Sequence, residues 1–152
     1  MAEITIRSMR PEDRDEVVAI AQSLTPWFSE SGIAHIRIDV KFQAGLVAEL
    51  DGRIVGFVTY YVADGAGNIG WIGLRQELLR RGIGRRLVQA LVDELRTAGV
   101  EELHVRTLGE SVNYAPYART RAFYHAMGFV DSKSTFQDNP ECPELLELVR
   151  QL

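Results

Sequence analysis

The sequence predicts a mixed α/β domain in which helices pack against one largely antiparallel sheet. Two β-rich runs, 45–50 and 53–62, are separated by an Asp-Gly pair at 51–52, which is favoured in tight hairpin turns. A strongly amphipathic helix pattern follows over 82–99, and β-rich runs return toward the C-terminus. Since strands come both before and after the helix, the order of elements indicates one sheet with helices on its faces.

The first half of the chain begins with an alternating apolar and polar pattern that predicts a strand over 3–8. A proline followed by acidic residues suits a first helical turn, so a helix is expected over 11–25. Residues 26–42 have mixed periodicity and predict a loop with a short helix. After the hairpin, a glycine-rich break at 64–67 leads into a third strand over 68–74.

The second half contains the clearest helix, over 82–99, followed by a predicted strand over 100–108. A second helix is expected over 116–127. Gly99 is placed to end the first helix and Gly128 to end the second. Two final strands are predicted over 129–135 and 145–152. The apolar stripe of the first of these helices consists of Ile83, Leu87, Val88, Leu91, Val92 and Leu95.

Composition excludes several classes of protein. The chain has 152 residues, about the size of one domain, so we expect a single domain over 1–152. A net charge of −4 argues against nucleic acid as the main partner, and no apolar run is long enough to span a membrane. The N-terminus lacks the apolar core of a secretion signal. Cys142 is the only cysteine, which excludes an internal disulfide and a thiolate metal cluster. We therefore expect a cytoplasmic protein that needs no metal.

A cluster of arginines and glycines around the start of the 82–99 helix is the segment most informative about chemistry. Gly82 and Gly84 allow close approach of the backbone to a ligand, and the free N–H groups of a helix start attract phosphate. A solvated helix start is the alternative interpretation of the charge. The arginines are Arg75, Arg80, Arg81, Arg85 and Arg86.

Two common nucleotide sites do not fit this segment. A P-loop requires Gly-Lys-Ser or Gly-Lys-Thr, but Gly84 is followed by Arg85 and Arg86. A dinucleotide fingerprint requires glycine or alanine where Leu87 stands. The segment therefore predicts a site for a different phosphorylated ligand.

Three stretches follow one another along the chain: LVAELDGRIVGFV, LRQELLRRGIGRRLV and TRAFYHAMGF. In that order they resemble the second and third strands, the pyrophosphate-binding segment and the late tyrosine-containing helix of the GNAT superfamily of acyl-CoA-dependent N-acetyltransferases. They occur in the family order over nearly the whole chain. The resemblance implies splayed strands that form a cleft for acetyl-CoA, and transfer of an acetyl group to a primary amine.

The resemblance also implies roles for individual residues. Tyr124 aligns with the tyrosine that gives a proton to the departing thiolate, and a phenol is protonated at neutral pH. Tyr124 shares one polar helix face with Tyr117, Thr120 and Arg121, although a place at a packing edge is the alternative. The residues assigned to the cofactor are Ile72, Leu74, Arg80, Arg81, Gly82, Ile83, Gly84, Arg85 and Tyr117.

The sequence departs from the family pattern at the expected general base. The family often has a glutamate on the strand before the CoA loop, and no carboxylate occurs over 68–74. Glu110 is the predicted substitute, while Glu30 and His35 are further candidates. Leu79 and Tyr117 also replace residues that are more usual in the family.

Two other functions remain open. One is a non-catalytic acyl-CoA-binding or sensing domain, which the missing glutamate favours and Tyr124 disfavours. The other is an interaction module without affinity for CoA. The acceptor, a small-molecule or peptide amine, and the choice between monomer and homodimer are not determined by the sequence. The aromatic residues that either line an acceptor pocket or pack in the core are Trp27, Phe28, Tyr60, Tyr61 and Trp71.

Overall fold

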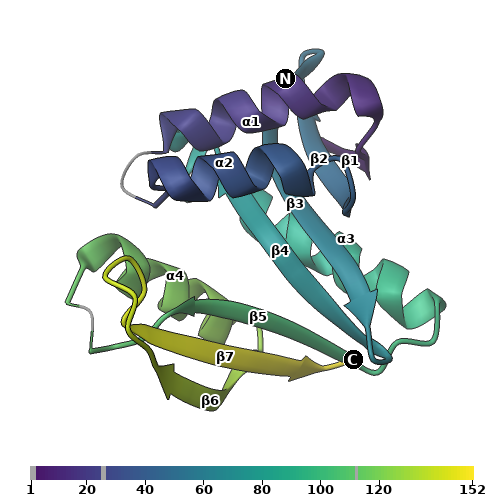
Figure 1. Ribbon diagram of the computed structural model, residues 1–152. Helices are drawn as coiled ribbons and strands as arrows, with labels where there is room; N and C mark the ends of the chain where they lie inside the picture. Colours follow the sequence, from purple (N-terminus) through teal and green to yellow (C-terminus); the bar gives the residue numbers. More distant parts are fainter. Residues whose placement is uncertain (1–2, 25–26, 112) are drawn as a thin grey trace.

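A seven-stranded sheet in the order β1-β2-β3-β4-β5-β7-β6 organises the protein, as the computed structural model in Figure 1 shows. The structure describes residues 3–24, 27–111 and 113–152. Only β4 and β5 are parallel, so the predicted largely antiparallel sheet is confirmed. The elements are β1 (Thr5–Ser8), α1 (Arg14–Ser23), α2 (Glu30–Asp39), β2 (Ala44–Leu50), β3 (Arg53–Ala63), β4 (Ala66–Leu74), α3 (Ile83–Thr97), β5 (Glu102–Leu108), α4 (Ala115–Ala126), β6 (Val130–Phe136) and β7 (Glu144–Gln151), with 3-10 turns at Pro11–Asp13 and Gln76–Leu78.

Two Asp-Gly turns connect β2, β3 and β4. The predicted turn at Asp51 and Gly52 has φ values of 52° and 76°, the left-handed backbone that such hairpins require. Asp64 and Gly65 adopt the same conformation, with φ values of 53° and 79°. The region expected as a break over 64–67 is therefore a second tight hairpin, and β4 begins two residues earlier than predicted.

The segment between the first strand and the hairpin forms two helices. The predicted helix over 11–25 begins as a 3-10 turn and continues as α1, while 26–42 contains the ten-residue α2. The Ser29 hydroxyl caps α2 by accepting a hydrogen bond from Gly32 N at 3.1 Å. Residues 25 and 26, at the boundary between these predictions, lie outside the described part of the chain.

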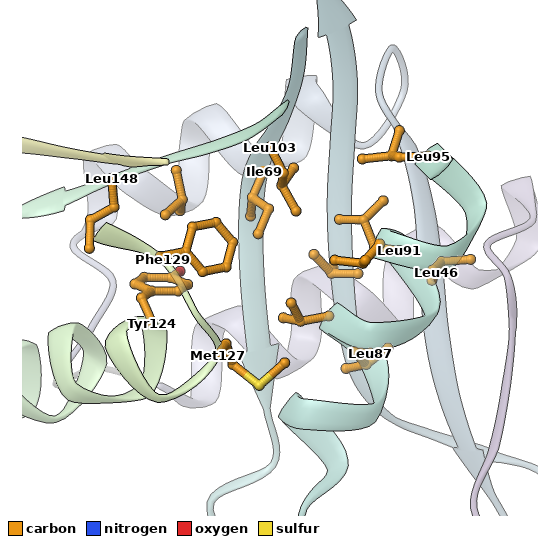
Figure 2. Close-up of a cluster of buried hydrophobic side chains, with 14 of the residues drawn as sticks. Leu46, Ile69, Leu87, Leu91, Leu95, Leu103, Tyr124, Met127, Phe129 and Leu148 are labelled. Atoms are coloured by element: carbon orange, nitrogen blue, oxygen red, sulfur yellow. The ribbon is translucent and has the colours of Figure 1, made fainter. Parts of the chain in front are cut away.

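The two faces of the sheet are covered by different helices. α1 and α2 pack together over one face, and α3 lies behind the sheet in Figure 1. The predicted apolar stripe of α3 is fully buried. Figure 2 shows Leu87, Leu91 and Leu95 of this stripe directed toward the strands, with Tyr124 and Phe129 at the α4 side of the same cluster. No helix among the described residues is long and apolar enough to cross a membrane.

Candidate functional site

A cavity of about 1540 Å³ lies where β4 and β5 separate. The two strands pair only at Gly67↔Leu103 and Asn68↔His104, and Figure 1 shows them diverging away from the C-terminus. The residues that follow on each strand, 69–74 and 105–108, line the cavity. Because β5 has turned away, the edge of β4 that faces the cavity has no strand partner. Its backbone N–H and C=O groups are therefore available to a ligand.

A β-bulge in β4 accompanies this separation. Val58 pairs with Ile72 and Tyr60 with Ile69, so that Gly70 and Trp71 together face the single residue between them on β3. Trp71 N donates to the Thr59 hydroxyl at 2.9 Å. A Cβ atom at position 70 would lie 2.1 Å from Gln43 Oε1 and 2.8 Å from Thr59 Oγ1, so a larger residue there would have to displace these side chains.

The loop before α3 contains two residues in the left-handed backbone region. Arg80 has a φ of 67° and Gly82 a φ of 78°, and Gly82 is the N-cap of α3. The first helical hydrogen bond of α3 runs from Arg86 N to Gly82 O at 3.1 Å, which leaves the amides of the preceding turn free of helical partners. Arg80 and Arg85 line the cavity at this point. The arrangement offers an anion several N–H groups, the positive end of the helix dipole and two guanidinium groups.

Tyr124 lies on α4, the helix that contacts β5, and lines the same cavity. Its side chain is only 3% exposed, and its ring packs against Phe123 and Phe129 at centroid distances of 5.5 and 5.6 Å. Burial raises the pKa of the Tyr124 hydroxyl well above its usual value, and the nearby Tyr117 hydroxyl acts in the same direction. The phenol therefore stays protonated at neutral pH and is available as a proton donor.

Contacts across the cavity join the α1–α2 connection to α4. The indole Nε1 of Trp27 donates to Pro116 O at 3.2 Å, and the Tyr117 hydroxyl donates to Trp27 O. Ser29 Oγ donates to Glu141 Oε2, in the β6–β7 loop, at 3.3 Å. These bonds tie together segments that lie about ninety or more positions apart in the chain.

A buried polar cluster fixes the loop between β5 and α4. Arg121 is buried and donates through Nη1 to Leu108 O at 2.8 Å and Gly109 O at 3.1 Å. Glu144 accepts a hydrogen bond from Ser111 N at 2.9 Å and another from the Ser134 hydroxyl. The hydrogen bonds from these two serines hold the pKa of Glu144 below its usual value. The cluster positions the start of α4, and with it Tyr124.

Most of the predicted site residues lie together around this cavity. Arg81 and Glu110 are the exceptions: both are exposed, and neither is among the described residues that line it. The predicted residues that line the cavity are Ile72, Leu74, Arg80, Gly82, Ile83, Gly84, Arg85, Tyr117 and Tyr124. Sequence reasoning missed Arg119 and Glu141, because a charged residue in a loop or on a helix carries no local signal of what it faces.

The aromatic candidates divide between the cavity and other places. Trp27, Phe28 and Trp71 line the main cavity, and Phe28 and Trp71 contact each other edge to face with centroids 5.9 Å apart. Tyr60 instead donates to Glu94 Oε2 on α3 at 2.7 Å. Tyr61 lines a smaller cavity of about 180 Å³. Within the described ranges, no group of three or more metal-ligating side chains occurs.

Comparison with known proteins gives one sequence family. The profile of the acetyltransferase (GNAT) family matches residues 9–129, which is most of the chain. No curated protein sequence matches the chain.

Solved structures of this family share the fold. A Desulfovibrio desulfuricans protein described as a GNAT-family acetyltransferase superposes with a TM-score of 0.86, at 20% identity, covering 98% of this chain and 99% of that one. The ribosomal-protein-S18-alanine N-acetyltransferase from Escherichia coli gives a TM-score of 0.78 at 19% identity, with 98% and 94% covered. The PaiA N-acetyltransferase from Thermoplasma acidophilum, solved in complex with coenzyme A, gives 0.74 at 17% identity, with 99% of both chains covered. At these identities the similarity establishes the fold.

Proposed function

The chain belongs to the acetyltransferase (GNAT) family, and we propose that it transfers an acetyl group from acetyl-CoA directly to a primary amine. The observation that carries this proposal is the shared cavity. It combines an unpaired strand edge, a helix start rich in free N–H groups, and a buried protonated tyrosine. An acetyl-CoA-binding domain without chemistry would need the first two features but not the third.

The proposed donor site follows β4 into the start of α3. The free amides between Arg80 and Arg85 would bind the pyrophosphate, and the unpaired edge of β4 near Ile72 and Leu74 would hydrogen-bond the pantetheine arm. An amide near Leu74 would also stabilise the oxyanion that forms on the thioester carbonyl. We include Tyr117, which lines the cavity, among the residues that contact the CoA arm.

In the proposed reaction a neutral amine attacks the thioester carbon. A C–N bond forms, the C–S bond breaks, and the electron pair of that bond leaves on sulfur. Tyr124 gives its proton to the thiolate and regains one from the nitrogen, which loses a proton as the tetrahedral intermediate collapses. Transfer without a covalent enzyme intermediate is supported by Cys142: burial raises the pKa of its thiol, which disfavours the nucleophilic thiolate.

Glu110 stays the predicted general base, although its side chain is exposed beyond the end of β5.

The test of the proposed function is enzymatic turnover. We expect thiol release from acetyl-CoA that depends on both enzyme and a primary amine, together with an acetylated product seen by mass spectrometry. The amines to be tried are spermidine, 2-phenylethylamine, an aminoglycoside and a peptide with an N-terminal alanine. If the protein binds acetyl-CoA but releases no thiol with any of them, the result would support the sensing domain instead.

A further inference from the structure

The side of the cavity formed by α2 and the β6–β7 loop carries one imidazole and one carboxylate. These belong to His35 and Glu141, and they are the only histidine and the only acidic residue among the described residues that line the cavity. Ser29 N-caps α2 and donates to Glu141, while His35 lies less than two turns further along the same helix. The two groups therefore flank the first turns of α2.

The hydrogen bond made by His35 determines where its basic nitrogen lies. Its Nδ1 is 2.8 Å from Ser31 O, and a carbonyl oxygen only accepts, so Nδ1 carries a hydrogen. In the neutral imidazole the free lone pair is then on Nε2. No described residue hydrogen-bonds Nε2, which leaves this lone pair available to a ligand in the cavity.

Three aromatic rings line the same cavity as these two groups. Trp27 and Phe28 precede α2 directly, and Trp71 faces the helix from β4, where its indole Nε1 donates to Asp39 Oδ2 at 2.7 Å. Asp39 and His35 are four residues apart and so lie on one face of α2. Rings at this position favour a flat apolar body, and their faces also attract an ammonium group.

We propose that this wall is the acceptor subsite for an arylalkyl primary amine, in which Glu141 binds the ammonium group and His35 Nε2 removes its proton. The inference rests on the proposed function. It supplies the base that β4 lacks, since Asn68, Gly70 and Trp71 stand where a carboxylate would be expected.

In this step His35 takes one proton from the ammonium group of the acceptor. An N–H bond of the ammonium breaks, its electron pair stays on nitrogen, and the proton moves to Nε2. The imidazolium that forms is stabilised by the Glu141 carboxylate and later releases the proton to solvent. The other charged groups that line the cavity come from the start of α3, β5 and α4, and are Arg80, Arg85, Arg106 and Arg119.

The test uses the full chain with acetyl-CoA and 2-phenylethylamine, and compares kcat/KM from pH 5.5 to 9.5 in wild type, H35Q and E141Q. His125 provides the matched control H125Q, because it is exposed on α4 and pairs with Asp131 at 2.7 Å outside the cavity. We expect H35Q to lose about 10²–10⁴-fold in kcat/KM at pH 7, the usual contribution of a positioned base. Wild-type kcat/KM should level off once imidazole is neutral, whereas that of H35Q should keep rising with pH as free amine accumulates.

For E141Q we expect a KM for the amine raised about tenfold to a hundredfold, as loss of a charged hydrogen bond predicts, with a smaller change in kcat. H125Q should match wild type. Three outcomes would each overturn the subsite. Wild type and H35Q could have equal pH profiles, or a wild type that binds acetyl-CoA could fail to acetylate 2-phenylethylamine. The third outcome is a comparable loss of kcat/KM in E110Q and in none of the other variants. A wild type whose melting temperature does not respond to acetyl-CoA would instead overturn the proposed function itself.

Discussion

Replacing Tyr124 with phenylalanine separates catalysis from folding, because the hydroxyl is the only group removed. The ring keeps its contacts with Phe123 and Phe129 in the buried cluster. The hydroxyl makes no hydrogen bond to another residue of the described ranges, so its loss leaves no partner unsatisfied. We expect the free energy of unfolding to change by less than about 1 kcal/mol.

The catalytic effect of Y124F is expected to be much larger. If the hydroxyl protonates the leaving thiolate, its removal should lower kcat by about 10²–10⁴-fold, or roughly 3–5 kcal/mol in activation free energy. The acetyl-CoA Kd should stay within about twofold, since the tyrosine acts on sulfur only as the bond breaks. Steady-state thiol release and calorimetric titration with acetyl-CoA measure the two quantities.

Tyr60 provides the control, because its substitution should lower stability and leave catalysis unchanged. Y60F removes a real hydrogen bond, to Glu94 Oε2, at a site outside the cavity. It should destabilise the protein by about 1 kcal/mol, which for a domain of this size lowers the melting temperature by about 2–4 °C, and leave kcat unchanged. A kcat for Y124F within threefold of wild type would refute the assignment of Tyr124 as the acid.

Three further substitutions, one of them a control, test the loop before α3 and the polar cluster around Arg121 and Glu144 at the start of α4. G82A places a Cβ at a φ of 78°, which should cost about 1–2 kcal/mol of stability and also weaken acetyl-CoA binding. The control is G99A, at a φ of 84° beyond the other end of α3. It should lose the same stability and bind acetyl-CoA as tightly as wild type. Equal acetyl-CoA affinities in the two variants would contradict the phosphate-binding role of the loop. E144Q should be less stable than wild type near pH 7, because a folded-state pKa below the usual 4.5 stabilises the ionised form. The difference in stability between wild type and E144Q should vanish as the pH falls below about 4.5 and through the folded-state pKa. If the difference persists in acid denaturation curves, the Glu144 charge is not its cause.

The elements that the sequence predicted well are those determined by local patterns. The Asp-Gly pair at 51–52 gave the first hairpin, and the apolar stripe of α3 is buried as its spacing indicated. The Asp-Gly pair at 64–65 carries the same turn signal, although the neighbouring glycines make the segment resemble a break between strands. The local turn chemistry alone would therefore predict the second hairpin.

The cavity itself depends on long-range geometry that no local pattern encodes. The pairing of β4 with β5 stops after two positions, and the bulge opposite Thr59 is defined only by the register of β3 and β4. The bonds between Trp27 and α4 join segments about ninety residues apart. For the same reason the sequence indicates Glu110 and His35 together as candidate bases. Both side chains are exposed, and only the fold shows that His35 lines the cavity whereas Glu110 does not.

Thermal unfolding with acetyl-CoA tests the central claim, that the cavity between β4 and β5 is a donor site, most directly. A ligand that binds only the folded protein adds about 2.7 kcal/mol at one hundred times its Kd, which raises the melting temperature of a domain of this size by roughly 5–10 °C. We predict such a shift with acetyl-CoA and with CoA, and none with ATP or NAD at the same concentration. No shift with either CoA compound, or equal shifts with all four ligands, would contradict a specific acyl-CoA site.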